Sequence, residues 1–165
     1  MPADFSFDVV SEVNLNLVAE SIQVALKEIV NRFDFKDAKA SIELLEKEKK
    51  LVVRAVDDFR VKAAMEALST RMAKRGLPLK NFTKGKIEQA LGQTARMDVA
   101  IQAGIPTDKS REMVAAIKAK KLKVTAAIQA DQVRVTSRSK DELQAAMALL
   151  RAGDYGIALQ FRNFR

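Results

Sequence analysis

Apolar positions recur along this chain with two different periods, and the two periods alternate in a regular order. Stretches in which every second residue is apolar predict strands, and stretches in which apolar residues stand three and four apart predict helices. In the helix predicted over 15–32, for example, Val18, Ile22 and Ile29 fall on one stripe. The first part of the chain predicts a strand, a helix, a hairpin, a helix and a weaker strand, over residues 5–13, 15–32, 39–54, 57–76 and 79–91.

The second part of the chain repeats this order of elements. It predicts a strand, a helix, a hairpin, a helix and a strand, over residues 94–103, 104–120, 122–137, 139–153 and 157–164. Ser139 and Glu142 have the spacing of a capping box, in which each side chain accepts a hydrogen bond from the other residue's backbone N–H. The last helix is therefore expected to begin at Ser139 and to end at Gly153.

Short sequence similarities indicate an internal duplication. Phe7-Asp8-Val9-Val10 is similar to Met97-Asp98-Val99-Ala100, and residues 63–68 are similar to residues 145–150. Each copy has the element order β-α-β-β-α-β, which is that of a ferredoxin-like unit. We therefore predict an α+β protein, a tandem duplication of two ferredoxin-like (βαββαβ) units with antiparallel sheets. Their expected bounds are 1–92 and 93–165.

In such a unit the helices cover one face of the sheet, so strand alternation sorts side chains between the covered face and the free face. In the second copy the expected free face is basic, rich in amides and hydroxyls, and carries one aromatic ring. The side chains expected to bind a nucleotide there are Arg96, Lys123, Gln129, Arg134, Thr136, Gln160, Arg162 and Phe164. An Arg side chain can donate two parallel hydrogen bonds to a phosphate or to a guanine edge. Gln and Thr side chains can form hydrogen bonds with base edges, and a Phe ring can stack on a base. The simpler interpretation is the solvated side of an open antiparallel sheet.

The segment Arg32-Phe33-Asp34-Phe35-Lys36, after the first helix, is a second candidate binding element. Its two rings could stack on a purine, and its charged groups could bond the purine edge. The simpler interpretation places the rings in the core and pairs Arg32 with Asp34 at the surface. We favour the core for the rings and keep Arg32 as a candidate nucleotide-binding residue.

Composition narrows the functional classes. The chain has 165 residues, a net charge of +8, no cysteine and no histidine, so it has no thiol chemistry and lacks the commonest general base and metal ligand. It also lacks a Walker-type glycine-rich loop and a dense carboxylate cluster.

The net charge is +2 over residues 1–92 and +6 over 93–165, which favours the second copy for phosphate contact. No apolar run is long enough to span a membrane, and no secretory signal is recognisable at the start. We expect a cytoplasmic protein that is not an enzyme and uses no cofactor or metal.

Several motifs together resemble the bacterial YajQ family. They are the start Ser6–Val13, Arg32-Phe33-Asp34-Phe35, Lys121–Val124, Gln129 with Gln132–Thr136, and the end Leu159–Arg165. The resemblance implies two ferredoxin-like units, and it leaves open an exchange of N-terminal strands between them. It also implies nucleotide binding, with cyclic di-GMP, ATP, GTP or tRNA as ligands and a role in transcriptional co-regulation. The chain departs from the family pattern after Phe35, where Lys36-Asp37-Ala38 stands in place of a segment that usually contains glycine.

Three functional hypotheses follow. The first is a non-enzymatic, intracellular nucleotide-binding protein, a cyclic di-GMP effector that influences transcription through a partner. The second is an RNA- or tRNA-associated protein that uses the basic sheet for backbone contact. The third is a protein-interaction adaptor whose free sheet faces dock a transcription factor or each other. The strands expected at the centre of the second sheet, 95–102 and 132–137, carry no outward aromatic, which argues against the base stacking of RNA-recognition modules.

Overall fold

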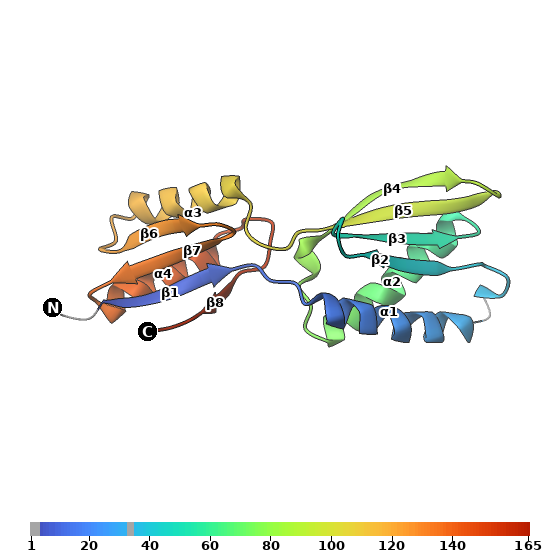
Figure 1. The fold of residues 1–165 in the computed structure, drawn as a ribbon, viewed down its shortest axis with the longest axis horizontal. Helices are drawn as coiled ribbons and strands as arrows, with labels where there is room; N and C mark the ends of the chain where they lie inside the picture. The colour runs from blue at the N-terminus through green and yellow to red at the C-terminus, as the bar shows by residue number, and fades with distance from the viewer. Residues whose placement is uncertain (1–3, 33–34) are drawn as a thin grey trace. The chain divides into compact units, whose positions relative to one another are not determined.

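The computed structural model describes residues 4–32 and 35–165, and these form two compact units (Figure 1). Unit 1 consists of the segment up to Glu12 together with Ala103–Arg165, and unit 2 consists of Val13–Gln102. The chain therefore enters unit 2 after its first strand and returns to unit 1 for the remainder. No helix in the described part of the chain is long and apolar enough to cross a membrane.

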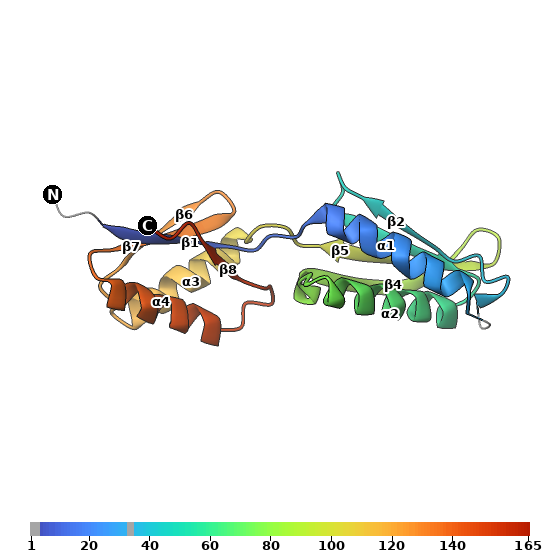
Figure 2. The same ribbon diagram turned by 90° about the horizontal axis from the view of Figure 1, so that it is seen from below.

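Unit 1 is a four-stranded antiparallel sheet with two helices. Its elements are β1 (Phe5–Val10), α3 (Thr107–Ala119), β6 (Thr125–Gln129), β7 (Gln132–Ser137), α4 (Lys140–Ala152) and β8 (Gln160–Arg162). The strand order is β6-β7-β1-β8. Both helices pack on the same face of this sheet (Figure 2).

Unit 2 has the same plan. Its elements are α1 (Leu15–Val30), β2 (Ser41–Leu45), β3 (Lys50–Ala55), α2 (Asp58–Lys74), the 3₁₀ turn η2 (Leu79–Asn81), β4 (Phe82–Ala90) and β5 (Thr94–Ile101). The strand order is β2-β3-β5-β4, again antiparallel throughout. The two ferredoxin-like units predicted from the repeat are therefore present.

The first strands of the two repeats are exchanged. β1 lies between β7 and β8, and β5 lies between β3 and β4. Each strand thus occupies the central position that the other would fill in a simple tandem array. The units are therefore not the contiguous segments 1–92 and 93–165 predicted from the sequence. Because β1 and β5 carry similar copies of the repeated sequence, the repeat does not indicate which sheet contains which strand.

Each unit has its own apolar core between the sheet and the helices. In unit 1, Phe7 and Val9 of β1 are buried together with Val133 and Val135 of β7. In unit 2 the corresponding strands bury Met97 and Val99 of β5 against β3. Met97 and Val99 belong to the second copy of the sequence repeat, but they are core residues of unit 2. Ile128 is 41% exposed near the end of β6.

The helix starts follow the expected capping chemistry, with one difference. Asn14 caps α1 by accepting from the Leu17 N–H, and Asp57 caps α2 by accepting from the Arg60 N–H. Ser139 caps α4 by accepting from the N–H of Glu142 at 3.3 Å. The Glu142 carboxylate does not complete a capping box, because it accepts instead from the backbone N–H of Lys123 at 3.1 Å. That bond ties the segment before β6 to the first turn of α4.

The closing strand is shorter than predicted because a bulge interrupts it. β8 ends at Arg162, which faces Asp8 in the β1–β8 register. Two backbone hydrogen bonds then join Ser6 to Arg165, whereas uninterrupted pairing would join Ser6 to residue 164. The extra residue is Asn163, which has the left-handed φ of 57° that asparagine tolerates better than most residues. Beyond Asn163 the alternation of faces is therefore reversed.

The turn after α1 contains no glycine between Phe35 and Ala40. Asp37 (φ 59°) and Lys39 (φ 50°) both take left-handed backbone conformations there. Phe35 is buried in the core of unit 2, as the simpler interpretation predicts, and the Arg32 guanidinium lies 5.1 Å from the centre of its ring. Phe33 and Asp34 lie outside the described residues.

Candidate functional site

The free face of the unit 1 sheet is organised around a buried carboxylate. Asp8 on β1 is 1% exposed, although it points away from the apolar core. Arg134, its neighbour on β7, donates from Nε to Oδ1 at 2.9 Å and from Nη2 to Oδ2 at 3.3 Å. Asn163 of the bulge donates from Nδ2 to Oδ2 at 2.7 Å. Hydrogen bonding to Arg134 lowers the pKa of Asp8, although burial opposes the shift. Arg134 therefore balances a buried charge within the sheet.

Two further residues expected at the site bond the chain segment that leaves β1. The Gln160 side-chain oxygen accepts from the backbone N–H of Glu12 at 2.8 Å. Arg162 lies 3.3 Å from the Glu12 carboxylate, with both side chains more than half exposed. Gln160 and Arg162 thus hold the end of β1 beside β8.

Where β1 begins and β7 ends, the same sheet carries a cavity of about 420 Å³. We call it the basic cavity; it is lined by Asp4, Lys123, Val124, Thr125, Thr136, Ser137, Arg138 and Ser139. Lys123 is exposed. Arg138 is 81% exposed and forms a long ion pair with Asp4, in which Nε lies 3.9 Å from Oδ1. The Ser137 hydroxyl donates to the Lys123 carbonyl at 2.7 Å, which fixes the two walls relative to each other.

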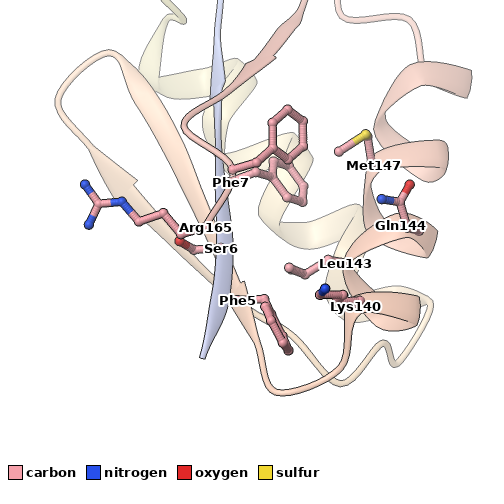
Figure 3. A pocket seen from close by; sticks show the side chains of 9 residues that line it. Phe5, Ser6, Phe7, Lys140, Leu143, Gln144, Met147 and Arg165 are labelled. Atoms are coloured by element: carbon pink, nitrogen blue, oxygen red, sulfur yellow. The ribbon is translucent and has the colours of Figure 1, made fainter. Parts of the chain in front are cut away.

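A second cavity, of about 310 Å³, lies on the helix side of the same end of the sheet (Figure 3). We call it the aromatic cavity; it is lined by Phe5, Ser6, Phe7, Lys140, Leu143, Gln144, Met147, Phe164 and Arg165. The Phe164 ring is 60% exposed, and its centre lies 6.1 Å from that of the buried Phe7 ring. The Lys140 ammonium lies 4.9 Å from the centre of the Phe5 ring, a cation–π distance.

The structure places the expected site residues in several locations. Lys123 and Thr136 meet in the basic cavity. Gln129 is exposed at the opposite end of the β6–β7 hairpin, where it pairs with Gln132. Phe164 was expected on the free face, but the bulge at Asn163 turns it to the helix side, into the aromatic cavity.

Arg96 and Arg32 belong to unit 2 and therefore do not share a sheet with the other expected residues. Arg96 lies on β5, where it bonds Asp98 at 2.8 Å. Lys50 bonds the same carboxylate at 3.3 Å, and the two cations lower the pKa of Asp98. Arg96 is thus in a charge-balanced cluster on a different sheet.

The distribution of charge also changes with the true unit boundaries. Unit 1 contains 12 basic and 9 acidic residues, a net charge of +3, and unit 2 contains 17 and 12, a net charge of +5. The excess of positive charge counted over residues 93–165 therefore does not belong to one structural unit. β1 and the residues on either side of it bring three carboxylates into unit 1, those of Asp4, Asp8 and Glu12. Local cation placement, and not net charge, distinguishes the basic cavity.

Several lining residues were not singled out from the sequence. Thr125 and Arg138 could be found by alternation, since both fall on the expected free face, but Lys140 and Gln144 required knowing how α4 packs beside β1. Phe5 could be assigned to this unit only once β1 was placed in the unit 1 sheet.

Among residues 4–32 and 35–165, no group of three or more acidic side chains is arranged to hold a metal ion. Tyr155 is buried, and burial raises the pKa of its phenol, so the phenol stays protonated near neutral pH. Exposed cations and hydroxyls around an open cavity are the groups that bind phosphate.

Comparison with known proteins identifies the family. Residues 5–165 match the family described as "Nucleotide-binding protein YajQ-like". A protein of Elusimicrobium minutum named nucleotide-binding protein is 58% identical over 163 residues, covering 99% of both chains. Proteins with the same name from Carboxydothermus hydrogenoformans and, with a numbered designation, from Bacillus cereus are each 45% identical over the full length of both chains. This chain belongs to the YajQ-like family.

Proposed function

We propose that unit 1 binds a nucleotide and that the basic cavity receives its phosphate. The observation that carries this proposal is the convergence of Lys123 and Arg138 with the hydroxyls of Thr125 and Thr136 around one cavity. Two cations and two hydroxyls match the charge and the acceptor oxygens of a phosphate. The names of the relatives, which are nucleotide-binding proteins, support the same class of ligand.

Arg138 is the strongest phosphate ligand in this proposal. Its side chain is 81% exposed, and its partner Asp4 stands 3.9 Å away, so little has to be broken when a phosphate arrives. Arg134, by contrast, uses Nε and Nη2 to hold a buried carboxylate. Recruiting those donors would leave Asp8 with a charge that burial disfavours.

Cyclic di-GMP is the nucleotide we propose, with the protein acting as a non-enzymatic intracellular effector that passes the signal to a transcriptional partner. Its two phosphates offer two anionic groups to the exposed cations at this end of the sheet. The absence of histidine and cysteine in the chain supports a binding role over a catalytic one.

Association with RNA is the second candidate. The observation in its favour is that both units are basic, with net charges of +3 and +5. The central strands of both sheets carry no outward-facing aromatic side chain, so RNA would be held mainly through its backbone. Such binding weakens steeply as salt rises.

Calorimetric titration with cyclic di-GMP, GTP and a short RNA, each at low and high salt, distinguishes the candidates. We expect stoichiometric binding of cyclic di-GMP that changes little with salt. Lys123→Gln and Arg138→Gln should each weaken it about 10-fold, the effect of losing one charged hydrogen bond. The control is Arg54→Gln, which removes an exposed cation from the free face of the unit 2 sheet and should leave affinity unchanged.

Two results would contradict the binding of cyclic di-GMP in the basic cavity. Affinity that collapses with salt and grows with RNA length would favour the RNA candidate. Equal losses in Arg138→Gln and Arg54→Gln would show that the basic cavity has no special role.

A further inference from the structure

The aromatic cavity combines apolar walls with a polar rim. The rings of Phe5, Phe7 and Phe164 form part of its lining, and Met147 and Leu143 contribute from α4 (Figure 3). Lys140, Gln144 and Arg165 also line it. A cavity of about 310 Å³ is at the small end of the range for small-molecule sites, which suits one planar ring system.

Phe164 is held in this position by the strand bulge. Asn163 adopts a left-handed φ and bonds Asp8 on the free face, so the next side chain emerges on the helix side. Although it contacts Phe7, more than half of the Phe164 side chain remains exposed. An exposed ring beside a cavity is a ready surface for stacking.

The aromatic cavity adjoins the basic cavity along the chain at two places. Asp4 lines the basic cavity and Phe5 the aromatic one, and Ser139 and Lys140 are divided in the same way. The backbone is thus shared between the two linings at both places, with successive Cα atoms about 3.8 Å apart. Both cavities lie at the end of the sheet where Phe5 pairs with Ser137.

We infer that the aromatic cavity receives the purine base of the nucleotide, stacked on Phe164, while its phosphate lies in the basic cavity. This inference rests on the proposed function and adds the base site to it. The amide of Gln144 is placed to bond the edge of the base. The Lys140 ammonium stands at the shared boundary, between base and phosphate.

Comparison of two probes tests the base site separately from the phosphate site. Guanosine 5′-monophosphate carries both base and phosphate, and ribose 5-phosphate carries only sugar and phosphate. NMR shift titrations of the full chain should show tighter binding of the guanosine probe. Phe164→Leu should weaken that probe about 5- to 150-fold, the range for losing one base–aromatic stack, and leave ribose 5-phosphate unchanged.

Phe59→Leu is the matched control, because Phe59 is 62% exposed and lies in unit 2, against 60% for Phe164. It should change neither affinity. Gln144→Ala, at an exposed position of α4, is a second variant that should not disturb the fold and should weaken only the guanosine probe.

Different results would contradict the base site and the proposed phosphate site. If the guanosine probe binds Phe164→Leu and Gln144→Ala as tightly as the unmodified chain, the base site is wrong and the phosphate site stands. If neither probe binds the unmodified chain, or if Arg138→Gln weakens neither, the proposed function itself is overturned.

Discussion

Asp8 and Arg134 face each other directly across the β1–β7 pair, and the guanidinium holds the carboxylate with bonds of 2.9 and 3.3 Å. The two residues are 126 positions apart in sequence. Their contact exists only because β1 lies in the sheet of unit 1. In the exchanged arrangement this ion pair occupies Arg134, which was expected from the sequence to bind a phosphate.

Arg134→Ala is expected to destabilise the protein. It leaves Asp8 buried with Asn163 as its remaining side-chain donor, and an under-bonded buried charge costs about 1–3 kcal/mol. Urea unfolding followed by circular dichroism measures the loss. Arg162→Ala is the control, because its ion pair with Glu12 is more than half exposed and should be worth under about 1 kcal/mol. If the two variants lose the same free energy of unfolding, burial of Asp8 does not strengthen the contribution of its ion pair to stability.

Stability should decline on the acid side because of Asp8. Its pKa is lowered in the folded state, so the charged pair contributes fully above the unfolded value of about 3.9. The contribution is lost as pH falls through the lower folded value. Asp8→Asn should therefore be less stable than the unmodified chain near neutral pH, and the gap should narrow below about pH 4. Unfolding midpoints measured across this range test the sign; a gap that widens with acid would contradict it.

The element pattern was predictable because it depends on local periodicity and on caps such as Asn14 and Asp57. The exchange of β1 and β5 was not, since Asp8 and Asp98 occupy equivalent positions in strands with the same alternation. Either strand could fill either sheet by pattern alone. Local periodicity therefore carries no information about which sheet contains β1 and which contains β5.

Asn163 should tolerate glycine better than a branched residue. Glycine takes the left-handed φ of 57° freely and loses only the hydrogen bond to Asp8, whereas valine adds a backbone cost of about 1–2 kcal/mol. Thermal melting should therefore rank the unmodified chain first, Asn163→Gly second and Asn163→Val third. If the valine and glycine variants have the same melting temperature, the left-handed backbone conformation of residue 163 does not limit the stability of the bulge.

The same bulge explains why only part of the site was predictable. Simple alternation places Thr136 on the free face, because β6 and β7 pair without interruption from Gln129 to Thr125. Lys123 lies just before β6 and also lines the basic cavity. It fails at Phe164, where one inserted residue reverses the faces. A left-handed asparagine near the end of a strand leaves only a weak sequence signature, so the error could be corrected only by the structure.

Fragments of similar length should behave very differently. Residues 13–102 contain all four strands and both helices of unit 2, and should fold alone with a cooperative melt. Residues 1–92 lack β5, the central strand that buries Met97 and Val99, and should not form this sheet. Amide shift dispersion and melting of the two fragments decide the point. Cooperative folding of 1–92 with native-like shifts would contradict the exchange.

The central claim is that the nucleotide binds at one end of the unit 1 sheet. Amide NMR of the full chain during titration with cyclic di-GMP tests it directly. We predict that the largest changes in amide chemical shift occur at Lys123, Thr136, Arg138, Lys140 and Phe164. The amide shifts of unit 2 should change little. Saturable shifts centred on unit 2, or none at all, would contradict it.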